Sequence, residues 1–232
     1  MFSHRYFVRY GDYQDMETVK PASLLDMVQD ISTLHSDACG YDMHTLYAKN
    51  LCWILQGLKL RLEQPVSVSK PVDVLTAVKN MKGITSERGC ILQQDGMTVA
   101  KTIANWVLFD SAAGKLSRIP KDMGEAYGFH NFEDDFFSYA KPVTEETEPL
   151  WTVRVSRREI DTNRHLNNQK SAEILMDALP EGFCFRDLTL YYKKSAYEGD
   201  ILTLCRGEIE GGWYAELKTE DDELCVAGRF TK

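Results

Sequence analysis

The segment DTNRHLNN, residues 161–168, places residue types that can do acid–base chemistry close together. Asp161, Asn163 and His165 alternate, and in an extended segment such side chains lie on the same side of the chain. We expect this set to suit hydrolysis of an acyl bond. His165 would move a proton, Asp161 would orient or charge the imidazole, and Asn163 would fix water or substrate.

A helix is predicted directly after this segment, from Asn167 or Asn168 through Ala178, and Pro180 ends it. The first-turn amides of a helix lack partners within the helix and carry the positive end of its dipole. They can therefore hold a carbonyl oxygen that becomes an oxyanion during acyl transfer. Asn167 and Asn168 are the candidates at this helix start.

A polar turn that only caps the helix is the alternative interpretation, because Asx-rich loops commonly do this. A calcium loop is excluded, since His165 and Leu166 stand where such a loop needs an oxygen ligand and glycine. The six cysteines form no CxxC pair and no zinc-ligand spacing. The sequence thus predicts no metal and no cofactor.

The elements that must position these residues occur in two cycles. Residues 21–38 predict a helix in which Leu24, Val28, Ile31, Leu34 and Ala38 share one face, and Gly40 follows as a stop. Strand-like runs follow this helix up to residue 110. The second cycle has a strand near 150–160, the helix after residue 167, and further strands to the end.

An internal duplication explains the repeated order of elements. The tetrapeptides DVLT (73–76) and DILT (200–203) each begin a strand in their cycle. A curved sheet wrapped around one helix can cover the helix's apolar sides. We therefore predict an α+β pseudo-dimer within one chain.

Composition and charge limit the function further. A net charge of −8 over 232 residues argues against general nucleic-acid binding. No apolar run is long enough to span a membrane, and the N-terminus lacks a signal segment, so a cytoplasmic location is expected. The local basic residues are either a solvated surface or a docking patch for an anionic partner; they are Arg154, Arg157, Arg158, Arg164 and Lys170.

Several segments together resemble acyl-acyl carrier protein thioesterases. DTNRHLNNQKSAEILMDALP is similar to the hallmark segment of that family, and LTLYYKKSAYEGD resembles its strand with a Tyr-basic-basic sequence. PASLLDMVQDISTLHSDACGYD is similar to the helix of its first domain, and NWVLFDSAAGKLSRIP to the strand and tail that close that domain.

This resemblance implies a double hotdog fold. Residues 1–125 would form an N-terminal hotdog with the acyl-chain pocket, 126–148 an acidic linker, and 149–232 a C-terminal hotdog with the catalytic residues. It also implies that Asp161, Asn163 and His165 are catalytic, that the substrate is a fatty acyl chain on acyl carrier protein, and that this acidic partner docks on the basic residues. Assembly into a homodimer is compatible with the resemblance.

The sequence departs from the plant pattern at Ser195 and Ala196. The resemblance implies an acidic residue there in many family members, followed by a cysteine in the plant members. A cysteine nucleophile is therefore not expected, and Ser195 and Glu198 are candidate auxiliary groups beside Asp161. His35 is interpreted as a core or pocket-lining residue and Glu173 as a solvated helix position. Two other functions stay open: an acyl-CoA or aryl-CoA thioesterase of the same fold, and a non-catalytic acyl-binding protein.

Overall fold

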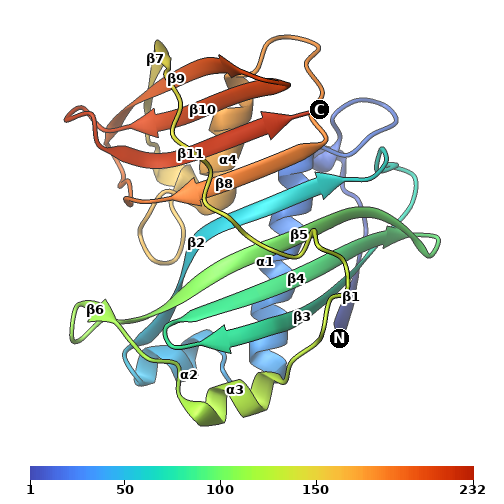
Figure 1. Ribbon diagram of the computed structural model, residues 1–232, viewed down its shortest axis with the longest axis vertical. Helices are drawn as coiled ribbons and strands as arrows, with labels where there is room; N and C mark the ends of the chain where they lie inside the picture. Colours follow the sequence, from blue (N-terminus) through green and yellow to red (C-terminus); the bar gives the residue numbers. More distant parts are fainter. The chain divides into compact units, whose positions relative to one another are not determined.

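The computed structural model describes all 232 residues, which divide into two compact units, Met1–Tyr139 and Ala140–Lys232. The elements of the first unit are β1 (Phe2–Tyr6), α1 (Pro21–Ala38), α2 (Met43–Ala48), β2 (Leu51–Leu62), β3 (Val72–Lys82), β4 (Thr85–Gln94), β5 (Met97–Asp110), β6 (Lys115–Leu116), α3 (Lys121–Tyr127) and a 3₁₀ turn at Tyr10–Asp12. Figure 1 labels them along the chain.

The second unit has the same arrangement of one main helix and a sheet, with fewer short helices and strands. Its elements are β7 (Glu148–Arg154), a 3₁₀ turn at Arg157–Glu159, α4 (Asn168–Asp177), β8 (Asp187–Tyr192), β9 (Ile201–Ile209), β10 (Gly212–Lys218) and β11 (Leu224–Thr231).

The two sheets have the same strand order. In the first unit the antiparallel order is β1-β3-β4-β5-β2, and in the second it is β7-β9-β10-β11-β8. Each of these five strands in one unit therefore has a counterpart at the same place in the other, and only the short β6, which pairs with β5, has none. The tetrapeptides 73–76 and 200–203 fall at the start of the equivalent strands β3 and β9. This is the arrangement that an internal duplication predicts.

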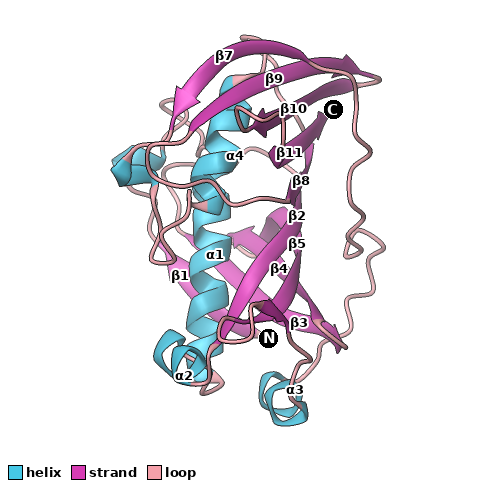
Figure 2. Cartoon of the chain, turned by 90° about the vertical axis from the view of Figure 1, so that its left-hand side faces the viewer, coloured by secondary structure: helices cyan, strands magenta, loops and turns pink.

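In each unit a single helix lies against one face of the sheet, which is the hotdog arrangement (Figure 2). The predicted helix at 21–38 is confirmed as α1, in which Leu24 and Ile31 are fully buried and Leu34 is partly buried. Ala38 is exposed, because the helix ends there and Gly40 turns the chain at φ 78°. The helix predicted after residue 167 is confirmed as α4.

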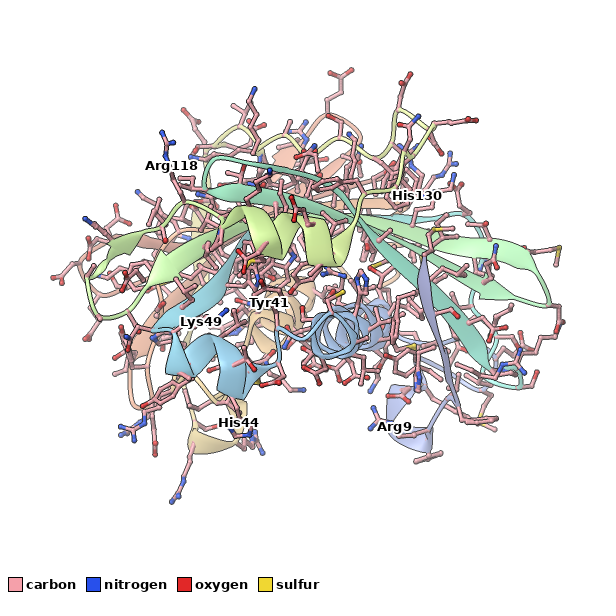
Figure 3. All side chains as sticks on the ribbon, turned by 90° about the horizontal axis from the view of Figure 1, so that it is seen from below. Arg9, Tyr41, His44, Lys49, Arg118 and His130 are labelled. Carbon is pink, nitrogen blue, oxygen red and sulfur yellow. The ribbon has the colours of Figure 1, made fainter.

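The open end of the first sheet is closed by short elements around α2 and α3. Tyr41 and Tyr127 stack there with ring centroids 5.9 Å apart, and Met123 is fully buried in the same cluster. The Lys49 ammonium lies 5.0 Å from the Tyr41 ring centroid. Figure 3 labels both residues.

The outer face of the first sheet is covered by the chain that follows α3. Phe132, Phe136 and Phe137 pack there against Ala77 and Ile103. The division between the units at Tyr139 and Ala140 therefore assigns the first half of segment 126–148 to the N-terminal unit. No helix of the structure is long and apolar enough to cross a membrane.

Gly89 on β4 is required by this covering segment. A Cβ at this position would stand 2.5 Å from the ring of Phe132, far inside van der Waals contact. We predict that Gly89→Ala lowers the free energy of unfolding by about 1–3 kcal/mol, because the added methyl overpacks a filled site. Urea unfolding of the purified protein measures this.

The matched control is the pair Gly89→Ala with Phe132→Ala. Removing the ring makes room for the new methyl, so the double variant should lose less stability than the sum of the two single variants. Additive losses would show that the ring and Gly89 do not constrain each other.

Candidate active site

Residues 160–166 form a closed loop rather than the extended segment that the alternation of residue types predicts. Ile160 and Leu166 pair as an antiparallel bridge, and the Asp161 N–H donates to the His165 carbonyl at 2.8 Å. The extended geometry was therefore wrong. The two ends of the segment meet, and its polar side chains are displayed by a loop of the second unit.

The Asp161 carboxylate causes this closure. Its Oδ1 accepts hydrogen bonds from the backbone N–H groups of Asn163 at 2.8 Å and His165 at 3.1 Å. Asp side chains often bond the backbone two residues onward in this way, in competition with extended structure. Arg164 then takes the left-handed conformation at φ 64°. Asp161 thus holds the backbone of the loop and makes no hydrogen bond to the imidazole.

The His165 ring is partly buried against an aromatic side chain from another loop. Its centroid lies 5.1 Å from that of Tyr197, with the planes at 78°. The Asn163 side chain is exposed and makes no hydrogen bond within the chain. Imidazole and amide are therefore both free to meet a substrate, while the backbone between them is fixed.

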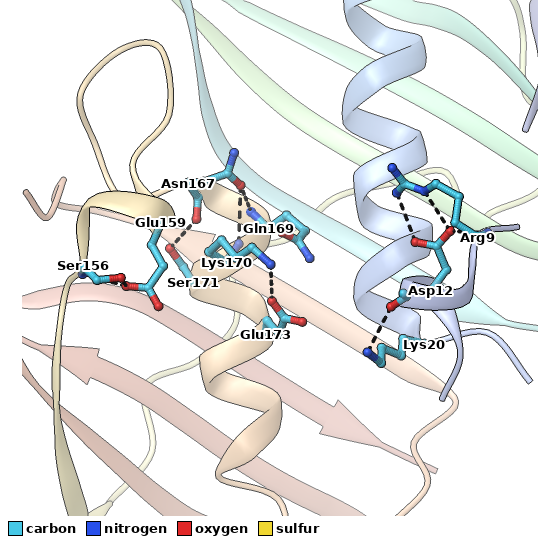
Figure 4. Close-up of polar contacts among 11 residues, drawn as sticks. Arg9, Asp12, Lys20, Ser156, Glu159, Asn167, Gln169, Lys170, Ser171 and Glu173 are labelled. Atoms are coloured by element: carbon cyan, nitrogen blue, oxygen red, sulfur yellow. Dashed lines mark hydrogen bonds and ion pairs between the residues drawn. The ribbon is translucent and has the colours of Figure 1, made fainter. Parts of the chain in front are cut away.

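Asn167 is the N-cap of α4, as Figure 4 shows. Its Oδ1 accepts from the Gln169 N–H at 2.8 Å and, at 3.4 Å, from that of Lys170. These bonds occupy two of the first-turn amides that the sequence offered to an oxyanion. The Asn168 N–H is left as the first-turn amide without an acceptor in the protein.

The loop that carries Ser195 and Glu198 lies beside this site. The Leu166 N–H donates to the Ala196 carbonyl at 2.8 Å, and Tyr197 contacts the imidazole as described. Ser195 and Glu198 are both exposed, each one residue away from these contacts. The structure therefore brings both auxiliary candidates into the neighbourhood of His165 without a direct bond to it.

Comparison with known sequence families identifies the family of this chain. The family described as the acyl-ACP thioesterase N-terminal domain matches residues 1–127, and the acyl-ACP thioesterase C-terminal domain matches residues 140–225. Together these matches cover nearly the whole chain. The chain belongs to the acyl-ACP thioesterase family.

Individual relatives of this acyl-ACP thioesterase family member are distant. The chloroplastic palmitoyl-acyl carrier protein thioesterase of Arabidopsis thaliana is 22% identical over 207 residues, which is 78% of this chain and 47% of that protein. The chain thus spans about half the length of this curated relative.

Solved structures show the shared fold. An acyl-ACP thioesterase from Bacteroides thetaiotaomicron superposes with a TM-score of 0.90 at 17% identity, covering 99% of this chain and 96% of the other. The 12:0-ACP thioesterase from Umbellularia californica gives 0.86 at 14% identity, with 99% and 96% covered. The predicted double hotdog fold is confirmed.

Two residues that the sequence reasoning missed also support the loop at 160–166. Glu159 accepts hydrogen bonds from both the backbone N–H and the hydroxyl of Ser156, each at 2.7 Å. Burial raises the pKa of Glu159, but these bonds and nearby cations outweigh burial and leave the pKa below its ordinary value. The Asn167 N–H donates to the Glu159 carbonyl at 2.9 Å. The spacing Ser-x-x-Glu at 156–159 was the available signal, since it is a capping box.

Most of the basic residues proposed for docking are unpaired. Arg154, Arg157, Arg158 and Arg164 are exposed and form no ion pair in the chain. Lys170 differs, because its ammonium bonds the Glu173 carboxylate at 2.7 Å (Figure 4). Glu173 is therefore a partly exposed ion-pair partner on α4. The four arginines remain available to an anionic surface.

No group of three or more His, Cys, Asp or Glu side chains is placed to hold a metal ion. All six cysteines are free, and Cys90, Cys205 and Cys225 are buried in the sheets, where burial raises the pKa of each thiol. The groups with chemical capacity around His165 are thus an imidazole, carboxylates, amides and a hydroxyl.

We predict that Asp161→Ala destabilises the second unit while Asp161→Asn does not. Alanine removes the acceptor for two backbone amides, which costs about 1 kcal/mol at a partly exposed site. Asparagine keeps an oxygen in the same place. The free energy of unfolding, measured by urea titration, compares the two. Equal losses in both variants would mean that charge, not the hydrogen bonds, holds the loop.

Proposed function

We propose that this protein hydrolyses fatty acyl chains from acyl carrier protein by attack of water on the thioester carbonyl. The observation that carries the proposal is the match of both halves to the acyl-ACP thioesterase family, with the hallmark loop at the start of α4. The loop supplies the groups that the reaction needs.

His165 is the general base. Its ring accepts a proton from water as the oxygen attacks the carbonyl carbon, and returns a proton to the carrier thiol as the carbon–sulfur bond breaks. Tyr197 supports one side of the ring. Asn163, whose side chain is free, holds water or substrate.

Asp161 acts through the loop it closes. Because Oδ1 is engaged by the Asn163 and His165 amides, the carboxylate fixes the backbone that carries both side chains. Ser195 and Glu198 are auxiliary groups that hold water at the edge of the site.

The oxyanion is stabilised at the start of α4. The Asn168 N–H is not used within the chain, and it points from the positive end of the helix dipole. Asn167 keeps the neighbouring amides in place.

The carrier protein docks on the second unit through Arg154, Arg157, Arg158 and Arg164, with Lys170 contributing less because of its bond to Glu173. The acyl chain enters the N-terminal unit. A homodimer and a cytoplasmic location stay predictions.

We expect His165→Ala to lower kcat on acyl-carrier substrates by about 10²–10⁴-fold, because a general base contributes that much. Liberated fatty acid is measured by mass spectrometry against a series of carrier-bound chains. His44→Ala, which removes an exposed imidazole of the first unit, is the control. A folded His165→Ala protein with full turnover would rule out this role.

We expect the double change Arg157→Glu and Arg158→Glu to lower kcat/KM on acyl-carrier substrates by about tenfold at low salt, since it reverses charges that attract the acidic carrier. The loss should shrink at high salt, and acyl-CoA substrates should be less affected.

The control for this charge reversal is Lys115→Glu with Arg118→Glu, which changes the net charge equally at exposed positions of the first unit. If both double variants lose activity equally, the effect comes from total charge and the docking assignment falls.

A further inference from the structure

A row of polar side chains lies inside the N-terminal unit, between α1 and the sheet. On the strands, Cys90 pairs with Thr76 on one side and Thr102 on the other, so the three side chains share a face. Arg88 precedes Cys90 by two residues on the same face of β4, and His35 of α1 contacts it. All five residues are less than 9% exposed.

Arg88 is a buried cation without a carboxylate partner. Its Nη1 lies 2.7 Å from Nδ1 of His35 and 3.4 Å from the Thr76 hydroxyl, and its guanidinium carbon is 5.6 Å from the Tyr127 ring centroid. A guanidinium has five N–H donors and stays protonated in proteins. A buried charge of this kind is costly unless acceptors satisfy it.

The neighbours of Arg88 are neutral. Burial, together with the Arg88 charge, lowers the pKa of His35 from 6.5 to about 4, so the imidazole is neutral and accepts from the guanidinium. Phe2 stacks on one side of this ring, with centroids 5.4 Å apart. Burial raises the pKa of the Cys90 thiol, so this group adds no negative charge at neutral pH. The row thus offers more hydrogen-bond donors than acceptors.

Thr102 gives a second and independent sign of an incomplete site. Its hydroxyl is fully buried and has no hydrogen-bond partner of normal geometry, and only the Cys90 thiol, a weak hydrogen-bonding group, lies beside it. Buried hydroxyls are normally paired, because an unpaired polar group loses its bonds to water without replacement. A donor without a strong acceptor therefore lies in the same row as a cation without an anion.

We propose that this row, with Arg88 and Thr102 as its donors, binds an oxygen atom carried by the acyl chain, so that the preferred substrates are hydroxy- or keto-substituted chains. The inference rests on the proposed function, in which the chain enters the N-terminal unit. An oxygen on the chain accepts from the guanidinium and from the threonine hydroxyl. An unsubstituted chain offers no acceptor to the Thr102 hydroxyl or to the guanidinium N–H groups that His35 and Thr76 leave unused.

A purely structural role for the row makes different predictions. In that case Arg88 contributes to the packing of α1 on the sheet, and the Thr102 hydroxyl contributes neither to stability nor to binding. Thr102→Val is nearly isosteric and removes a hydroxyl that has no strong hydrogen-bond partner, so it should not weaken the fold. If it nevertheless lowers the preference for oxygenated chains, the hydroxyl is a binding group.

Binding is measured first, because it does not require hydrolysis. The purified full chain is titrated calorimetrically with a saturated fatty acid and with analogues of equal length that carry one hydroxyl or keto group at successive positions. At one region of the chain the oxygenated acid should bind about tenfold tighter than its parent, the gain expected for a hydrogen bond from a charged donor.

Arg88→Met and Thr102→Val should each reduce this preference by at least about threefold. Arg118→Met, an exposed arginine of the same unit that points outward in Figure 3, should leave the preference unchanged. If Arg88→Met does not fold, the binding preference of Thr102→Val alone tests the inference. The inference is overturned if no analogue binds better than its parent, or if the preference survives in Thr102→Val.

The same acids are then presented as carrier thioesters. Preferential binding without hydrolysis of any thioester would defeat the proposed function and leave the binding site standing. If every thioester is hydrolysed and the oxygen on the chain has no effect, the proposed function stands and the proposed binding site falls.

Discussion

The need to cover one amphipathic helix governs each half of this molecule. In α1 the apolar side chains lie on one face, and residues such as Leu24 and Ile31 lose all contact with water. Each such burial contributes about 1.5–3 kcal/mol, which is much of the net stability of a small domain. A short helix such as α4, ten residues long, has little stability of its own. Its position, and thus the position of the loop that enters it, is set by the sheet on which it packs.

That dependence explains how the loop at 160–166 is held in place. Two of its backbone amides are held by Asp161 and its exit is held by Asn167, so the chain between them has little freedom. The Leu166 bond to Ala196 then ties the loop to the segment after β8. Because these contacts use backbone groups, they leave the side chains of Asn163 and His165 unengaged by other polar groups. Rigid support and free functional groups are thus combined in the same few residues.

The sequence predicted the elements better than the loop. Apolar spacing located α1 and α4 to within a residue or two, since burial of one face imposes that spacing directly. The repeated strands and the residues around His165 followed from pattern and from resemblance. The alternation of residue types predicted an extended backbone at 161–165, and this was wrong because the pattern reports only the directions of side chains. Local bonds from Asp161 and the positive φ of Arg164 decided the conformation instead.

Two other features lay outside the reach of pattern reasoning. The aromatic residues at 132–137 lie in an acidic stretch, and the acidic composition led to its interpretation as a linker. The segment instead packs on the sheet. The row beside Arg88 was not recognised, because its members come from four separate elements and only the strand register brings them together. His35 was correctly predicted to lie in the interior, but the residues next to it in the sequence gave no sign that Arg88 is its partner.

The packing of Phe132 onto Gly89 has a consequence for how such proteins diverge. The matched N-terminal family region ends at residue 127, yet the side chains that cover the outer sheet follow it. A chimera of two relatives joined at residue 127 would take the sheet from one parent and the segment that covers its outer face from the other. The two packing surfaces would then not match. Crossovers placed after Tyr139 keep sheet and cover together, so recombination that preserves folding is expected to favour that point.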